Sequence, residues 1–342
     1  MNNSLLCWKA EDFGKVALSK RESAFYQRLN REIVALCRSL PESAQTDSIL
    51  FLMRYSRIAP GEKLDFFANY YSPIWSILYW LCHSQILPFK RLKKWDVASA
   101  VRAQSMAMFL HSLDDHLIDG QIPVSPLTLL LRSQAWTIMN RSFCNLAQDL
   151  PAGERTVRNF VGDYYSSLQD SRGPESLDGY CDLFRRQMAI LMVAPILLSV
   201  KMTRVLDFVK DIEIAYGSFG IAWRLLDDIN DIADDMEKGA HSSVYLCLPE
   251  ELKILWNNNA GARSSSARDS ASAIVNHILE HGLVDRIKGR ICTELREAAS
   301  IVEGQHLTGL AREFRCLAYP LGKSDSNEEE EDGRPEISLA SK

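Results

Sequence analysis

Hydrophobic residues recur every three or four positions along most of the chain, which is the spacing of amphipathic helices. Phe25, Leu29 and Ile33 show it within a helix predicted over residues 20–40. Prolines and glycines separate the further helices. These are predicted at about residues 62–69, 74–83, 92–119, 127–150, 155–169, 176–200, from 205 onward, 270–301 and 307–317. No segment alternates hydrophobic and polar residues as a half-buried strand does, so the predicted fold class is all-α.

Two local signals refine this helical pattern. Ser125 and Pro126 have the residue types of a helix cap and a first-turn residue. Pro195 lies inside the apolar segment 176–200, where it predicts a kink beside a cavity. We expect three parts in the chain: an N-terminal segment over residues 1–19, a helical domain over 20–322, and an acidic tail over 323–342.

An acidic stripe lies in the stretch 221–244, where Asp227, Asp231 and Asp235 follow one another at four-residue spacing. Residues at i, i+4 and i+8 share one side of a helix. Like charges at this spacing repel, and the stripe directly follows an apolar run, so we expect a cation there. Mg²⁺ prefers oxygen ligands and is usually held by one or two carboxylates plus the oxygens of a substrate phosphate. A solvated helix face is the alternative interpretation.

A second acidic cluster, Asp114, Asp115 and Asp119, follows the apolar run MAMFLHSL. Two such clusters, each on a helix, are what a diphosphate held between metal ions would need. Asp114 and Asp115 cannot point in the same direction on a helix, so we expect only one of them to contact the metal directly. His111 and His116 lie beside these acids but receive no role, since a hard Mg²⁺ site does not favour imidazole.

Charge and cysteine usage narrow the class of protein. The formal net charge is −5, and the tail from Lys323 holds seven acids against three basic residues, so the remainder is close to neutral. A nucleic-acid partner is therefore not expected, because it would call for a basic stripe. Eight scattered cysteines without a CxxC pair predict a reduced, cytoplasmic protein. The N-terminus lacks the pattern of a signal peptide, no stretch is apolar enough to span a bilayer, and the tail is expected to be disordered.

The paired motifs DDHLID and LLDDINDIADD, about 110 residues apart, resemble the two aspartate-rich motifs of the trans-prenyltransferase and class I terpene synthase superfamily. The resemblance covers roughly residues 97–244. It implies a single-domain helical bundle around a central active-site cavity and an isoprenyl diphosphate substrate. It also implies three Mg²⁺ ions bound by the two acidic clusters, and it allows a homodimer.

The resemblance also implies roles for residues outside the acidic clusters. SLDGYCDLFRRQMAILM is similar to the helix that precedes the second motif, where cyclases place an arginine that senses diphosphate. Arg185 or Arg186 would then act in catalysis. Further candidates for substrate binding are Arg224 and Lys238 for the diphosphate, Trp223 facing the carbocation, and Phe109 at the end of the chain cavity.

Each of these residues also has a structural interpretation. Arg185 and Arg186 could form surface ion pairs. Arg224 could simply pair with Asp228 at i+4. Phe109 and Trp223 could be ordinary core residues.

Departures from the family pattern decide the predicted reaction. Elongating members carry an early Gly-Gly-Lys-Arg motif and an Arg-Arg pair after the first aspartate motif, whereas here GQIPVS follows Asp119. We therefore predict a class I terpene synthase, a lyase that cyclises a linear C15 or C20 diphosphate. The first alternative is a prenyltransferase that joins an allylic diphosphate to isopentenyl diphosphate or another acceptor. The second is a non-catalytic subunit of the same fold.

Overall fold

The computed structural model describes residues 10–59, 61–84, 92–169, 173–203, 205–261 and 265–322, except for the side chains of residues 265–268. Within these ranges the regular structure consists of helices and contains no strand, which confirms the predicted all-α single-domain fold. The tail predicted to be disordered, residues 323–342, lies outside the described residues.

The helices of the first half of the chain build the part that contains the first acidic cluster. They are α1 (Lys20–Arg38), α2 (Glu42–Tyr55), α3 (Pro73–His83), α4 (Lys94–Ile118), α5 (Pro126–Ala147), α6 (Gly153–Gln169), α7 (Leu177–Gln187) and α8 (Ala189–Met202). The second half contains the acidic stripe. Its helices are α9 (Leu206–Asn230), α10 (Ile232–Lys238), α11 (Ser243–Leu246), α12 (Glu250–Asn259), α13 (Ser265–Glu280), α14 (Leu283–Gly304), α15 (Thr308–Ala318) and the 3-10 turn η2 (Pro320–Gly322).

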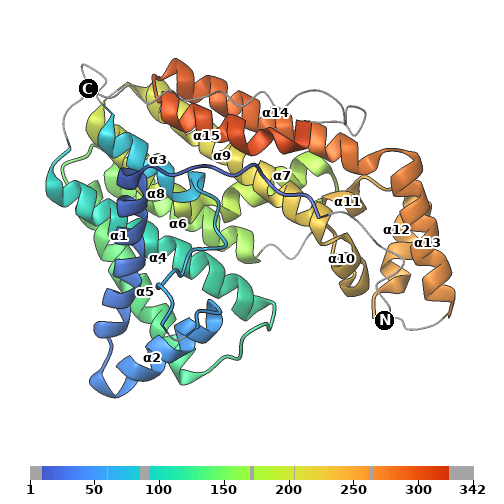
Figure 1. Cartoon of the computed structure of the whole chain (residues 1–342), viewed down its shortest axis with the longest axis horizontal. Coiled ribbons are helices and arrows are strands. Elements are labelled where there is room, and N and C mark those ends of the chain that lie inside the picture. Colours follow the sequence, from blue (N-terminus) through green and yellow to red (C-terminus); the bar gives the residue numbers. More distant parts are fainter. Residues whose placement is uncertain are drawn as a thin grey trace.

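The bundle is organised around α8 and the two long helices α4 and α9, which carry the acidic clusters. Almost every residue of α8 is buried, and α8 contacts α3, α4, α5, α6 and α9. Helices α9, α14 and α15 run side by side along one edge, and α12 and α13 form the far end (Figure 1). No single helix in the described ranges is long and apolar enough to cross a membrane. Helices α7 and α8 reach that length and apolarity only as a pair bent by 64°.

Capping residues set the helix ends as the sequence indicates. The Ser125 side chain accepts a hydrogen bond from the Thr128 N–H at 3.1 Å, and Pro126 occupies the first turn of α5. Ser19 and Glu22 form a complete capping box at the start of α1. The first turns of α5 and α1 are therefore each fixed by residues that are neighbours in the sequence.

The segment between α1 and α3 differs from its prediction. Residues 62–69 form turns instead of a helix, and α2 is a helix that the hydrophobic pattern did not indicate. The Asn30 side chain accepts the Phe66 N–H at 2.8 Å, and Asp65 accepts the Tyr26 hydroxyl and the Phe67 N–H. These side chains satisfy backbone groups that a helix would otherwise use.

The predicted kink at Pro195 is also wrong in position. The chain bends at Met188, between α7 and α8, and Pro195 lies within a continuous helix. Met188 packs against Gly220 of α9, where an added Cβ would come within 3.1 Å of the Met188 Cγ. The missing side chain at Gly220 therefore gives room for the bend.

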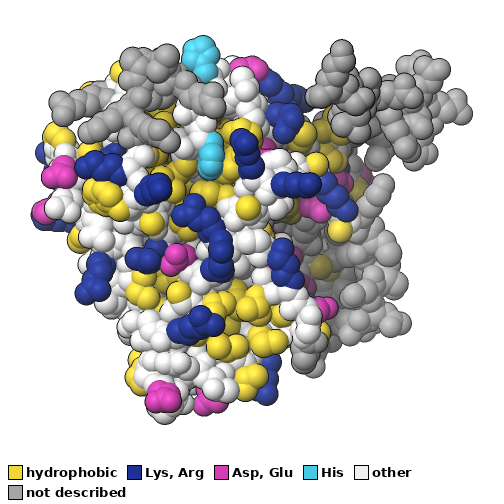
Figure 2. Space-filling view, turned by 60° about the vertical axis from the view of Figure 1, so that its left-hand side comes forward, with side chains coloured by type: hydrophobic (Ala, Val, Ile, Leu, Met, Phe, Trp, Pro, Cys, Tyr) yellow, Lys and Arg dark blue, Asp and Glu magenta, His cyan; other side chains and the backbone are white. Residues whose placement is uncertain are grey.

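One side of the surface is rich in basic side chains. Figure 2 shows Lys and Arg scattered singly over this face among hydrophobic and neutral side chains, with few Asp and Glu. On α1, Arg31 and Arg38 line a shallow groove together with Val34 and Ala35.

Candidate active site

The helices that carry the two acidic clusters, α4 and α9, approach each other through their side chains. The rings of His111 on α4 and Trp223 on α9 lie 6.3 Å apart, centroid to centroid. Asp115 and Asp227 each follow one helical turn later, so both carboxylates lie above this contact. The charge of Asp115 makes a small contribution to the raised pKa of Asp227, as expected for two carboxylates at the same end of this contact. The structure therefore brings the two sequence motifs together.

The acidic stripe crosses a break between two helices. Helix α9 ends at Asn230 and α10 begins at Ile232, with Asp231 at the junction. The Asp231 N–H donates to the Asp227 carbonyl at 2.9 Å, and the Asp235 N–H donates to the Asp231 carbonyl at 2.8 Å. The helical hydrogen-bond spacing thus continues through the break and keeps the three aspartates in register.

Burial and mutual repulsion raise the pKa of the stripe carboxylates. The Asp227 side chain is 51% exposed, yet burial raises its pKa to about 6, against the lowering effect of Arg224 and with further raising by Asp231. Burial and Asp228 raise the pKa of Asp235 to about 6 as well. The pKa of Asp231 is raised by burial and by Asp234. A nearby cation would relieve this cost.

The first acidic cluster divides into one buried and two exposed carboxylates. Asp114 is 5% exposed, and its two oxygens accept from Arg132 Nε at 2.5 Å and Nη2 at 2.9 Å. The Tyr164 hydroxyl donates to the same carboxylate at 3.2 Å. Asp115 and Asp119 are exposed, and Asp119 caps the end of α4. In this arrangement Asp115 and Asp119 are accessible to a metal ion, whereas Asp114 already binds Arg132.

A buried network supports the stripe from below. Asp228 is 1% exposed and pairs with Arg224 Nε at 3.0 Å. It also accepts the Tyr180 hydroxyl at 2.9 Å and the Ser243 N–H at 2.8 Å. Arg224 additionally reaches Asp227 Oδ2 at 3.4 Å. Arg224 was predicted to bind substrate or to pair with Asp228, and it pairs with Asp228. The roles of Tyr180 and Ser243 could not be predicted from the sequence, because no local spacing relates them to Asp228.

The other predicted cations lie around the stripe at different places. Lys238 is exposed at the end of α10, and its charge lowers the pKa of Asp231. Arg185 forms an ion pair with Asp182 and lies against Gly217, ten residues before Asp227 on α9. Arg186 is half-buried near the end of α7. The structure therefore places Lys238 beside the acids, and the roles of Arg185 and Arg186 stay predictions.

Aromatic side chains form the wall below Asp115 and Asp227. Trp223 contacts Tyr70 at 5.5 Å, Tyr71 at 6.3 Å and Phe219 at 6.4 Å between ring centroids. Phe109 is 4% exposed within the core. Burial lowers the pKa of His111, partly offset by Asp115 and Asp114. The resemblance had implied a role for Trp223, but Tyr70 and Tyr71 come from a turn region where no periodicity points to them.

The N-terminal segment passes over the same end of α9 (Figure 1). The Asn230 side chain accepts the Glu11 N–H at 2.9 Å and donates to the Glu11 carbonyl at 2.8 Å. The Tyr71 hydroxyl donates to Asp12 at 2.8 Å, and Phe13 packs edge-on against Tyr71 at 4.7 Å. We call residues 11–14 the N-terminal strap. It lies beside the acidic stripe, and the sequence alone gave no sign of it.

The donor set can be tested against Mg²⁺. Among the described residues, no three carboxylate, imidazole or thiol groups are close enough to enclose a metal ion by themselves. Mg²⁺ in phosphate-binding sites needs only one or two carboxylates. Asp235 Oδ2 is buried and has no hydrogen-bond partner in the described part of the chain, although both oxygens of Asp228 are used. The residues present therefore fit a Mg²⁺ site that substrate completes.

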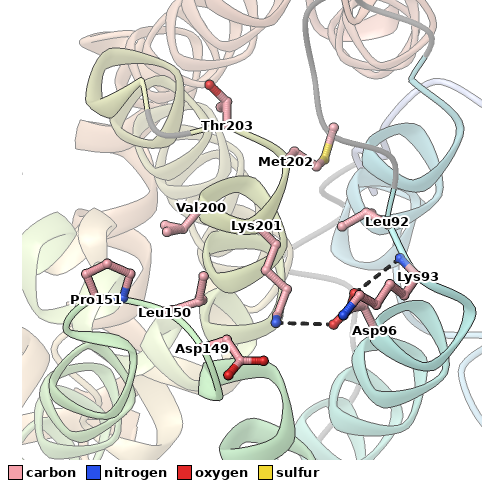
Figure 3. A pocket seen from close by; sticks show the side chains of 10 residues that line it. All are labelled: Leu92, Lys93, Asp96, Asp149, Leu150, Pro151, Val200, Lys201, Met202 and Thr203. Atoms are coloured by element: carbon pink, nitrogen blue, oxygen red, sulfur yellow. Dashed lines mark hydrogen bonds and ion pairs between the residues drawn. The ribbon is translucent and has the colours of Figure 1, made fainter.

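A separate cavity of about 240 Å³ lies at the other end of α4, between the loop after α5 and the end of α8 (Figure 3). There Lys201 Nζ pairs with Asp96 at 3.2 Å and donates to the Gln148 carbonyl at 3.1 Å. Asp96 precedes Asp115 by 19 residues, which is about 28 Å along a helix. This cavity is therefore distinct from the acidic clusters.

Neutralising Asp235 should stabilise the metal-free protein. Its raised pKa means that the folded state holds a proton more tightly, so this group's penalty is present above pH 6 and disappears as the pH falls toward 4. Asp235→Asn should raise the free energy of unfolding by about 1–2 kcal/mol at pH 7.5 and by about half of that at pH 5. Urea unfolding with EDTA at both pH values measures this, and a gain that grows toward acid pH would contradict it.

Comparison with known proteins places the fold. No protein-family model matches the chain, and no curated protein sequence does. Solved structures do match. Geranylgeranyl pyrophosphate synthase from Lactobacillus brevis has a TM-score of 0.66 at 13% identity, covering 87% of this chain and 96% of the other. Heptaprenyl diphosphate synthase from Staphylococcus aureus has a TM-score of 0.63 at 11% identity, covering 88% and 98%. Geranylgeranyl pyrophosphate synthetase from Pyrococcus horikoshii has a TM-score of 0.62 at 10% identity, covering 87% and 98%.

The chain has the fold of these prenyl diphosphate synthases, which confirms the fold that the resemblance implied. The prediction of a terpene cyclase is corrected by the same finding. These structural neighbours are prenyl diphosphate synthases, so they favour the prenyltransferase alternative over a lyase. The cyclase prediction rested on two missing cationic motifs, and a missing motif does not identify the reaction.

Proposed function

We propose that this protein is a trans-prenyltransferase, an enzyme that takes the prenyl group of an allylic diphosphate and joins it to an acceptor such as isopentenyl diphosphate. One observation carries the proposal: His111 on α4 and Trp223 on α9 are in ring contact, and Asp115 and Asp227 each follow one helical turn after it. The names of the structural neighbours support it, since all three are synthases of prenyl diphosphates.

The site residues form two groups, one for the diphosphate end of the substrate and one for its prenyl end. Asp115, Asp119, Asp227, Asp231 and Asp235 would hold Mg²⁺, which when bound neutralises the charge of the departing diphosphate. Lys238 lies beside the stripe to attract the same anion. Arg224 holds Asp228 and reaches Asp227, so it orients the stripe.

The wall below the carboxylates suits a carbocation. Trp223, Tyr70 and Tyr71 present ring surfaces that attract a cation electrostatically. The two tyrosine hydroxyls are turned to protein partners, since that of Tyr70 donates to the Met108 carbonyl and that of Tyr71 to Asp12. Ring surfaces that bind water weakly would help to keep it from capturing the cation.

Product analysis tests the proposal. Purified protein with Mg²⁺ is given geranyl, farnesyl or geranylgeranyl diphosphate, with and without isopentenyl diphosphate, and both the aqueous and organic phases are analysed by mass spectrometry. We expect a longer prenyl diphosphate only when both substrates are present. Release of a cyclic hydrocarbon from the allylic substrate alone would overturn the proposal, as would no consumption of any substrate. Cytoplasmic location and a homodimer stay predictions beside it.

A further inference from the structure

Three helices of the second half of the chain hold the N-terminal strap. Asn230 at the end of α9 binds both the N–H and the carbonyl of Glu11, at 2.9 Å and 2.8 Å. The Glu11 carboxylate forms an ion pair with Lys288 of α14 at 2.5 Å. The Gly14 N–H donates to the Leu317 carbonyl in the last turn of α15 at 3.1 Å. The strap is therefore tied to the bundle at both of its ends.

The strap also packs closely against the bundle. A Cβ on Gly14 would lie 1.9 Å from the carbonyl oxygen of Cys316, which is a backbone atom of α15 and has no side-chain freedom to move aside. The Phe13 side chain is 4% exposed and belongs to the hydrophobic core. Asp12, by contrast, is exposed. Its side chain is therefore not needed to fill the core.

The Asp12 carboxylate instead connects the strap to Tyr71. Its Oδ1 accepts the Tyr71 hydroxyl at 2.8 Å and the Phe13 N–H at 2.7 Å. The Phe13 ring packs edge-on against the Tyr71 ring, with 4.7 Å between centroids. Two adjacent residues of the strap therefore hold Tyr71, one at its hydroxyl and the other at its ring.

Tyr71 carries this contact to the proposed prenyl wall. Its ring lies edge-on to Trp223, with 6.3 Å between centroids and an interplanar angle of 84°. Trp223, Asp227 and Asn230 follow one another at spacings of four and three residues, so they share one side of α9. The strap contacts Asn230 directly and Trp223 through Tyr71. It therefore borders the two helical turns that carry Asp227.

We propose that the N-terminal strap is part of the active-site wall, in which Asp12 and Phe13 are positioning residues that hold Tyr71 against Trp223 and so limit the capture of the allylic cation by water. This inference rests on the proposed function. Neither strap residue needs to touch the substrate, because both act through the Tyr71 ring.

The side reaction that the strap would suppress has a defined product. The allylic C–O bond breaks and the diphosphate leaves with the electron pair. The oxygen of a water molecule then bonds to the cationic carbon, and a proton passes to solvent. The product is a prenyl alcohol, whereas attack by the acceptor gives a longer prenyl diphosphate. The ratio of the two products reports how well the wall excludes water.

The experiment measures this ratio in place of the rate. Wild type and the variants Asp12→Ala, Asp12→Asn and Gly14→Ala are given Mg²⁺, farnesyl diphosphate and isopentenyl diphosphate in H₂¹⁸O, and both products are quantified by mass spectrometry. The ¹⁸O label enters the alcohol only when the C–O bond breaks, which excludes phosphatase activity. A variant that merely folds less well has less active enzyme but the same ratio.

We expect Asp12→Ala and Gly14→Ala to raise the ratio of labelled alcohol to longer diphosphate by about fivefold, the equivalent of one hydrogen bond. Asp12→Asn should stay within about twofold of wild type, because its amide oxygen can accept the same two hydrogen bonds. Gly289→Ala on α14 is the matched control, since its added Cβ has no atom within 4 Å. It should not change the ratio.

Two results would overturn the inference while leaving the proposed function intact. One is a wild-type ratio in Asp12→Ala, which keeps the test valid if Gly14→Ala fails to fold. The other is an Asp12→Asn variant that forms as much alcohol as Asp12→Ala. If wild type itself consumes no farnesyl diphosphate, both the inference and the proposed function fail.

Discussion

Replacing Asp115 or Asp227 with alanine is expected to reduce turnover of an allylic diphosphate by about 100-fold or more in each case. These carboxylates come from different helices and each follows the His111–Trp223 contact by one turn, so each would supply one side of the metal and diphosphate site. Helical content should not change, because both side chains lie outside the core. Steady-state assay with Mg²⁺ and circular dichroism of each variant measure the two effects.

Glu303→Ala provides the matched control for these variants. Glu303 is also a partly exposed acid on a long helix, but it pairs with Arg315, away from the stripe. Its loss should leave turnover within a factor of two. If Asp115→Ala and Asp227→Ala both retain turnover within a few-fold of wild type, the acidic clusters do not bind the reacting diphosphate.

Removing Arg224 should produce the largest loss of stability. Arg224→Ala leaves Asp228 as a buried charge, 1% exposed, with only the Tyr180 hydroxyl and the Ser243 N–H as partners. Breaking a buried pair from one side typically costs about 3–5 kcal/mol. Because the Arg224 side chain is 36% exposed, we expect about 2–4 kcal/mol. The midpoint of urea unfolding at pH 7.5 measures the change.

Two variants separate this effect from a general loss of arginine. Arg102→Ala removes an exposed partner of Glu32 and should cost less than about 1 kcal/mol. In Arg224→Ala/Asp228→Asn the buried charge is absent, so part of the stability lost in Arg224→Ala should return. Equal costs for Arg224→Ala and Arg102→Ala would show that Asp228 does not depend on its arginine.

The helical fold and the acidic clusters could be predicted from the sequence because their signals are local and periodic. Asp227, Asp231 and Asp235 lie four residues apart, so they share one side of a helix wherever that helix begins. The break at Asp231 does not change this. The Ser125 and Pro126 cap is equally local. The contacts that these residues make across the bundle leave no local or periodic pattern in the sequence.

The remaining errors come from contacts between distant segments. Residues 62–69 have a helical composition, but Asn30 and Asp65 bind their backbone groups and hold turns. The bend at Met188 depends on the space at Gly220, thirty-two residues later. Asp114 looked equivalent to Asp115, yet Arg132 from the next helix binds it.

The predicted reaction was wrong for a different reason. The cyclase prediction used the absence of an Arg pair after Asp119 as positive evidence, although cations can reach a site from any helix of a bundle. Arg132, the first arginine after Asp119 in the chain, shows how a basic residue one helix away comes to lie against the first acidic cluster. The charged residues that surround a substrate depend on where they lie in space, and a search for sequence motifs does not show this.

The hydrogen bonds between Asn230 and the N-terminal strap involve the main chain of the strap and not its side chains. The amide of Asn230 pairs with both the N–H and the carbonyl of Glu11, as a neighbouring peptide would in a sheet. The contact with Asn230 therefore excludes only proline at position 11, while the Glu11 side chain is held separately by an ion pair with Lys288. What the contact fixes is register: a one-residue insertion before Phe13 would leave Asn230 paired but pull Phe13 out of its place against Tyr71. The spacing between positions 11 and 13 is thus a length constraint that substitution of single side chains would not reveal.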